Sequence, residues 1–188
     1  MSPRISSINI NTLDFWESLW SNSSNSWTRN PNEVIRYEIA AGMQVGDSAL
    51  EIGCGQGGLA LALLQIHPEV SYLGTDFSSQ AIQTAICKRD YLVKSWEEVT
   101  ERADTVYAIE IIEHLNDPSG FIKHLAGLAN KRLVISTPRY KVHGFEKHRG
   151  AHMWDFTDDE IVDMLKVYGK VGERIPAGTD CQVVAVDL

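Results

Sequence analysis

Cysteine is scarce in this sequence, and that scarcity excludes two kinds of site. The 188 residues include 3 cysteines, Cys54, Cys87 and Cys181, which stand far apart and form no CxxC pair. A disulfide framework or a thiolate zinc site needs paired or closely spaced cysteines. We therefore expect three buried free thiols.

Long apolar runs are also missing. No stretch approaches the roughly 20 apolar residues that a membrane-spanning helix requires. The first residues, MSPRISSINI, lack the apolar core and the small-residue cleavage site of a secretory signal. We expect a single folded domain that stays in the cytoplasm and makes no membrane contact.

Positive charge is in deficit, with 17 Lys and Arg residues against 25 Asp and Glu residues and a formal net charge of −8. Nucleic-acid affinity depends largely on phosphates neutralised by Lys and Arg, so the deficit argues against a polynucleotide partner. Residues 131–149 depart from this pattern, because six Lys or Arg residues and one acidic residue, Glu146, give them a net charge of +5. This basic segment is either a solvated loop or a site for a phosphate, a carboxylate or a polynucleotide end.

Segments of strand and helix character alternate from residue 31 onward. Strands are expected at SALEIG, VSYLGTD, DTVYAIE, RLVIST, VYGKVGE and CQVVAVDL. Helices are expected from Pro31 to Gly42, over GGLALALLQIH and SSQAIQTAICK, from Pro118 to about Ala129, and over TDDEIVDMLK, which opens with a capping box. The alternation predicts an α/β fold, a Rossmann-like doubly wound sheet that is mostly parallel and has a C-terminal antiparallel hairpin strand.

Residues 1–29 stand apart from the single domain expected over residues 30–188. NTLDFWESLW places Leu13, Trp16, Leu19 and Trp20 on one helical face, and the polar run SNSSNS follows as a flexible tether. This helix could fold over a site as a lid, pack into the core or form a dimer contact. The residues do not decide between a monomer and a dimer.

LEIGCGQGG lies at the first expected turn from strand to helix. Its glycines let the backbone bend sharply and let a ligand approach the start of the helix. Gly53, Gly55 and Gly58 fit the dinucleotide pattern GxGxxG. Glu51, however, would be a poor neighbour for a pyrophosphate and a good one for a cationic ligand such as S-adenosylmethionine. Asp76 ends the next strand, where a carboxylate can accept both hydroxyls of a ribose.

Four segments, in this order and spacing, resemble the motifs of class I S-adenosylmethionine-dependent methyltransferases: ALEIGCGQGG, YLGTD, ADTVYAIEIIEHLNDP and KRLVISTP. The resemblance covers about residues 30–188 and implies S-adenosylmethionine as the cofactor and S-adenosylhomocysteine as the product. The cofactor would then contact Glu51, Gly53, Cys54, Gly55, Asp76, Phe77, Ser95, Trp96 and Glu110. The family usually has an Asp beside the adenine, whereas this sequence offers Ser95 and Trp96, so that Trp96 could supply a flat apolar wall.

AIEIIEHL places Glu110, Glu113 and His114 directly after an expected strand. In one interpretation this segment only ends the strand and starts the next helix. In another, the three residues resemble the Glu-x-x-Glu-His set of two metal-dependent groups, the small-RNA 3′-terminal 2′-O-methyltransferases and the ubiquinone-biosynthesis O-methyltransferases. HMWDFTDDE resembles a segment of the first group, which would make His152 the fourth ligand.

A divalent ion bound by these residues would have a chemical purpose. A hydroxyl acceptor is a weak nucleophile until it loses its proton, and a bound cation lowers its pKa. Mixed carboxylate and imidazole ligands suit Mn, Fe, Co or Zn better than Mg, which stays an option. Without a metal, Glu113, His114 or His152 could act as the general base.

The leading hypothesis for function is O-methylation of a small hydroxylated metabolite, which the basic segment would allow to be anionic. An RNA 3′-terminal 2′-O-methyltransferase and an N-methyltransferase are alternatives within the family. Two further hypotheses belong to other classes: an NAD-dependent oxidoreductase built on GxGxxG, and a binding module that keeps the cofactor site without the chemistry.

Overall fold

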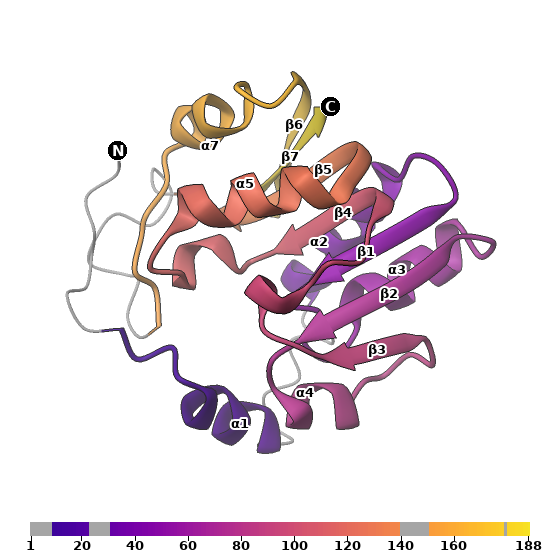
Figure 1. The fold of residues 1–188 in the computed structure, drawn as a ribbon, viewed down its shortest axis with the longest axis vertical. Helices are drawn as coiled ribbons and strands as arrows, with labels where there is room; N and C mark the ends of the chain where they lie inside the picture. The colour runs from indigo at the N-terminus through magenta and orange to yellow at the C-terminus, as the bar shows by residue number, and fades with distance from the viewer. Residues whose placement is uncertain (1–8, 23–30, 140–150, 179) are drawn as a thin grey trace.

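The computed structural model of the protein describes residues 9–22, 31–139, 151–178 and 180–188. Within them, one sheet contains β1 (Ser48–Ile52), β2 (Ser71–Asp76), β3 (Asp90–Val93), β4 (Ala103–Ile109), β5 (Ala129–Pro138), β6 (Lys170–Ala177) and β7 (Cys181–Asp187). The order across the sheet is β3-β2-β1-β4-β5-β7-β6 (Figure 1). Pairs among β1 to β5 are parallel, and β7 is antiparallel to both of its neighbours. The predicted fold class is confirmed.

Helices cover both faces of the sheet (Figure 1). They are α1 (Leu13–Ser21), α2 (Pro31–Gly42), α3 (Gly58–Ile66), α4 (Ser79–Gln83), α5 (Pro118–Leu128) and α7 (Asp158–Leu165), with 3-10 turns η2 (Trp96–Glu98) and η3 (Ile112–His114). Successive residues of a strand face opposite sides. On β1, Leu50 and Ile52 therefore pack in the layer of α5 and α7, while Ala49 packs in the layer of α2 and α3.

The helix caps predicted from the sequence are present in the structure. The Thr157 hydroxyl accepts a hydrogen bond from the amide of Glu160, and the Glu160 carboxylate accepts one from the amide of Thr157, so the predicted capping box of α7 is confirmed. Asp117 caps α5 by accepting from the amide of Gly120 at 2.9 Å. AIEIIEHL therefore ends β4 and leads through η3 toward α5, which both interpretations of the segment allow.

Two elements differ from the sequence prediction. The helix expected over SSQAIQTAICK ends after Gln83, because the amide of Ile86 donates to the carbonyl of Gln56 at 2.9 Å and draws the chain toward the glycine turn. Strand β3 was not among the expected strands. It is an edge strand of 4 residues, and its apolar run YLV is too short to show the alternation that marks a strand.

The topology determines where a ligand can bind. Strand β1 pairs with β2 on one side and with β4 on the other. The strand order therefore runs outward from β1 in both directions, which makes this place the topological switch point of the sheet. Open α/β sheets bind ligands at such a point, beyond the carboxyl ends of the strands. No helix among the described residues has the length and apolar character needed to cross a membrane.

Candidate active site

A cavity of about 650 Å³ opens at the carboxyl ends of β1, β2, β4 and β5. The turns after these strands line it, together with side chains from α1 and α2 and from the segment before α7. Of the residues predicted to bind cofactor, metal or acceptor, the following line the cavity: Gly53, Cys54, Gly55, Asp76, Phe77, Ser95, Trp96, Glu110, Glu113, His114 and His152. Glu51 is the one predicted residue that does not.

One end of the cavity is formed by the glycine turn after β1. Gly53 and Gly55 have φ values of +74° and +51°, which residues with side chains rarely adopt. A Cβ at Gly53 would also lie 2.2 Å from the Ile111 side chain. The carboxylate of Asp76 accepts from the amides of Gly55 and Ser78, both at 2.9 Å, and thereby ties the end of β2 to the turn.

Glu51 lies behind the glycine turn instead of at the cavity wall. Residue 51 alternates to the same face of β1 as Ala49, which turns its carboxyl group toward α2 and α3. There it accepts a hydrogen bond from the Tyr72 hydroxyl. Burial raises the Glu51 pKa to about 8, and the negative charge of Asp76 adds to this effect. In this position Glu51 does not line the cavity, so its contact with the methionine end of a cofactor stays a prediction.

The other end of the cavity lies after β4. Glu110 has a φ of +55°, a strained value for a residue with a side chain. Its carboxylate accepts from the Ser136 hydroxyl, lies 3.3 Å from Nη1 of Arg36 and accepts from the Cys181 thiol at 3.2 Å. Because these groups hold Glu110, the structure does not bring it into the metal-ligand set predicted for it.

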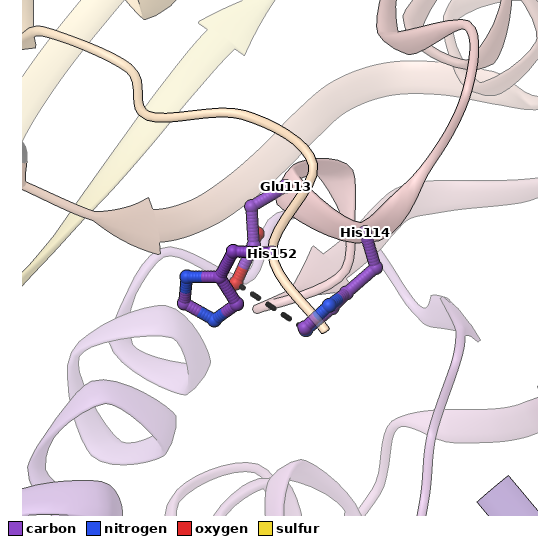
Figure 2. Close-up of side chains that lie close together, drawn as sticks. All are labelled: Glu113, His114 and His152. Atoms are coloured by element: carbon purple, nitrogen blue, oxygen red, sulfur yellow. Dashed lines mark ion pairs between the residues drawn. The ribbon is translucent and has the colours of Figure 1, made fainter. Parts of the chain in front are cut away.

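Three of the four predicted metal ligands do come together (Figure 2). Each of Glu113, His114 and His152 offers one ligand atom, and these atoms all lie within 4.8 Å of one another. Turn η3 presents the first two residues, and the carbonyl of Glu113 accepts from the amides of Met153 at 2.7 Å and Trp154 at 3.2 Å. Those bonds fasten the backbone beside His152 to the turn.

The electrostatics of this cluster favour the uncharged forms of Glu113 and His114. Burial raises the pKa of Glu113 well above its ordinary value, and the charge of Glu110 contributes further. Burial also lowers the pKa of His114. Nδ1 of His114 faces the carbonyl oxygen of Ala151 at 3.1 Å, which leaves Nε2, 3.9 Å from the Glu113 carboxylate, as the acceptor atom of the ring.

Comparison with known proteins agrees with this geometry. A family profile described as "Methyltransferase domain" matches residues 50–132, which include the glycine turn and η3. Over this segment the chain is similar to methyltransferase domains. The resemblance predicted from the sequence is thus confirmed, and the NAD-dependent oxidoreductase hypothesis finds no support.

Individual relatives share this domain. The ubiquinone biosynthesis O-methyltransferase of Rhodopseudomonas palustris is 30% identical over 147 residues, 65% of this chain and 57% of that protein. The magnesium-protoporphyrin O-methyltransferase of Synechocystis is 26% identical over 117 residues, 56% of this chain and 50% of that protein. The chain therefore spans only about half the length of these relatives.

Solved structures share the fold. The magnesium protoporphyrin IX methyltransferase of Synechocystis with bound S-adenosylmethionine superposes with a TM-score of 0.67 at 18% identity, covering 95% of this chain and 92% of that one. A putative methyltransferase in complex with the Haloferax volcanii Trm112 activator gives 0.74 at 13% identity, with 92% and 96% covered. At such low identities the likeness concerns the fold.

The sequence predicts that Trp96 supplies a flat apolar wall for the adenine, and that contact stays a prediction. Trp96 lines the cavity and packs edge-on against Phe121, with ring centroids 5.3 Å apart, and against His124 at 5.5 Å. Ser95 starts η2 in a capping box with Glu98. These contacts hold the indole as a fixed apolar surface.

The basic segment, residues 131–149, shows no unpaired cation among its described residues that could bind an anion. Its described cations are paired with carboxylates: Lys131 with Asp104 at 3.0 Å, Arg132 with Asp187 at 2.7 Å and Arg139 with Asp158 at 2.8 Å. Lys141, Lys147 and Arg149 lie outside the described residues. An anion site on this segment stays a prediction.

Sequence reasoning missed Arg36. It lies on α2, is 4% exposed and faces the cavity beside Glu110. Burial opposes its charge, but the neighbouring Glu110 carboxylate raises its pKa above the ordinary value. A single arginine within an ordinary helical pattern gives no local signal, because only the tertiary fold places it at the site.

Proposed function

We propose that the domain binds S-adenosylmethionine and transfers its methyl group to a hydroxyl oxygen of a small molecule. The observation that carries the proposal is the pairing, in one cavity, of the glycine turn and Asp76 with the Glu113, His114 and His152 cluster. One end suits an adenosyl cofactor, and the other offers proton acceptors or metal ligands. Both named relatives are O-methyltransferases, which supports this choice of acceptor atom.

The cofactor half would hold the adenosine between Asp76 and Trp96. Both oxygens of Asp76 already accept backbone amides, yet a carboxylate has about four lone-pair sites and can still accept ribose hydroxyls. Trp96 would lie against the adenine, and the open backbone at Gly53 and Gly55 would admit the methionine end. The sulfonium methyl would then point toward the turn after β4.

The acceptor half would remove the proton. Nε2 of His114 keeps its lone pair because Nδ1 donates to Ala151, so it can accept the acceptor's hydroxyl proton. The oxygen then forms its bond to the methyl carbon as the bond from carbon to sulfur breaks, and the electron pair stays on sulfur. S-adenosylhomocysteine and the methyl ether leave, and His114 gives its proton to solvent.

A divalent ion in the same cluster is the alternative, in which Nε2 of His114 would bind the ion instead of accepting the proton. Oε1 of Glu113 is buried and has no hydrogen-bond partner among the described residues, which a cation ligand would explain. Glu113, His114 and His152 would hold the ion, and this set of one oxygen and two nitrogen ligands favours Mn, Fe, Co or Zn over Mg. When bound, the ion would lower the pKa of the acceptor hydroxyl.

The charges of the cavity wall favour a neutral acceptor. Six acidic residues line it, namely Asp76, Glu97, Glu110, Glu113, Asp117 and Asp180, against the two cations Arg36 and Lys94. Arg36 pairs with Glu110 and Lys94 with Glu101. Such a wall suits the positive cofactor and disfavours an anionic acceptor, unless the basic segment beyond residue 139 supplies the opposite charge.

The proposal is tested by measuring cofactor binding first and methyl transfer second. Calorimetric titration with S-adenosylhomocysteine should give one saturable site on the wild-type protein, and absence of binding would reject the proposal. Transfer of labelled methyl from S-adenosylmethionine to a panel of phenols, alcohols, carboxylates and amines then identifies the acceptor class. Binding without transfer to any member would favour the non-catalytic module, and transfer to amines alone would favour N-methylation.

A further inference from the structure

Helix α1 adds nothing to the core of the domain. None of its residues is buried, and Leu13 is 48% exposed. Its indole side chains, Trp16 and Trp20, line the cavity instead. A helix of nine residues is not stable alone in water, so the position of α1 must depend on the contacts that it makes around the cavity.

One group of contacts joins α1 to the cofactor half. The Glu17 carboxylate accepts from the amide of Ser79 at 2.7 Å and from that of Gln80 at 3.3 Å, at the start of α4 and close to Asp76. The Trp20 ring lies over the glycine turn, where a Cβ at Gly55 would be 3.1 Å from it. Figure 1 shows α1 beside α4, outside the sheet.

A second group of contacts joins α1 to the acceptor half. The ring of Trp16 packs edge-on against His114, with centroids 5.1 Å apart. Just before the helix, the side-chain amide of Asn11 donates to the carbonyl of Ala151 at 2.7 Å, the same carbonyl that Nδ1 of His114 faces. The residue before His152 is thus held from two sides.

The two groups of contacts sit on one rigid element. Trp16 and Trp20 are four residues apart on the same face of α1 and stack with centroids 6.4 Å apart. A ligand on the glycine turn that holds Trp20 in place would therefore hold Trp16 against His114 as well. Because α1 has no buried residues, such a ligand would add directly to the few contacts that fix the helix.

We propose that α1 couples the two halves of the cavity, so that a cofactor bound on the glycine turn orders the residues around His152. Glu17 is the anchor of the helix, and Trp16 is a positioning residue for His114. The inference rests on the proposed function, because it requires an adenosyl ligand in the cofactor half. Helix α1 then does more than cover the cavity as a lid, because its docking helps to hold His114 and His152 in place.

Hydrogen exchange measured by mass spectrometry tests the coupling without any metal or acceptor. The amides of Met153 and Trp154, which donate to Glu113, report on the backbone beside His152. Saturating S-adenosylhomocysteine should slow their exchange roughly tenfold in the wild-type protein, within the usual range of coupling between sites. Glu17→Ala and Trp16→Ala should lose this protection, while Trp16→Phe should keep most of it.

A matched control comes from the same helix. Ser18 is exposed and adjacent to Glu17, so Ser18→Ala should retain the wild-type protection. Failure of S-adenosylhomocysteine to bind the wild-type protein would reject the proposed function and this inference together. Binding that leaves the exchange of Met153 and Trp154 unchanged, or that protects them equally in Glu17→Ala, would overturn the inference alone.

Discussion

Nδ1 of His114 lies 3.1 Å from the carbonyl oxygen of Ala151, the residue directly before His152. A carbonyl can only accept, so Nδ1 carries the proton and Nε2 is left facing the Glu113 carboxylate. The same bond brings the ring of His152 to within 4.9 Å of that of His114, measured between centroids. Two imidazoles and a carboxylate therefore lie close enough to share one ligand.

This arrangement predicts metal binding at one site. Titration of Mn²⁺ into metal-stripped protein saturated with S-adenosylhomocysteine should give a single saturable heat. Because removal of one ligand from a set of three leaves an incomplete site, His152→Ala should weaken binding by about a hundredfold or more. His67→Ala, which removes a histidine at the end of α3, should bind like the wild-type protein. Equal loss in both variants would point to nonspecific binding.

Asp76 should control cofactor affinity. Hydrogen bonds to a charged group contribute about 1.5 to 3 kcal/mol, which corresponds to a loss of roughly ten- to a hundredfold in affinity. Asp76→Asn keeps one oxygen acceptor for the glycine turn and should weaken S-adenosylhomocysteine binding by about that factor in calorimetry. Asp90→Asn, at an exposed position on β3, is the matched control. An unchanged dissociation constant for Asp76→Asn would place the ribose elsewhere.

Features set by neighbouring residues could be predicted from the sequence, whereas features set by the tertiary fold could not. Helix caps, the glycine turn and the run containing Glu113 and His114 are local patterns, and each lies where its pattern indicated. The direction of Glu51 depends on which face of β1 turns toward the cavity, and the motif alone did not fix that face. Arg36 reaches the site only because the fold brings α2 against the ends of β4 and β7.

The buried carboxyl group of Glu51 should make stability depend on pH. Its pKa is raised from 4.5 to about 8 by burial, so the folded protein binds one more proton than the unfolded chain between these values. Stability from this group is fully present below pH 4.5 and should fall, by on the order of 5 kcal/mol at about 1.4 kcal/mol per pKa unit, as pH rises through 8.

Urea unfolding at pH 5, 7 and 8 measures this dependence. Glu51→Gln keeps an acceptor for the Tyr72 hydroxyl but cannot ionise, so the variant should match the wild-type protein at pH 5 and exceed its free energy of unfolding at pH 8. Parallel pH profiles for the two proteins would show that Glu51 does not titrate in this range.

Arg36 and Glu110 form a buried ion pair at 3.3 Å, with side chains 5% and 14% exposed. Removing one partner of such a pair costs about 3 to 5 kcal/mol, because the other charge stays buried without compensation. Arg36→Met should therefore lower the free energy of unfolding by about 3 kcal/mol. The double variant Arg36→Met, Glu110→Gln should recover most of that loss, since no charge is then stranded and the amide can still accept from Ser136. If the double variant were as unstable as Arg36→Met, the loss would come from packing around α2 and not from the charge of Glu110.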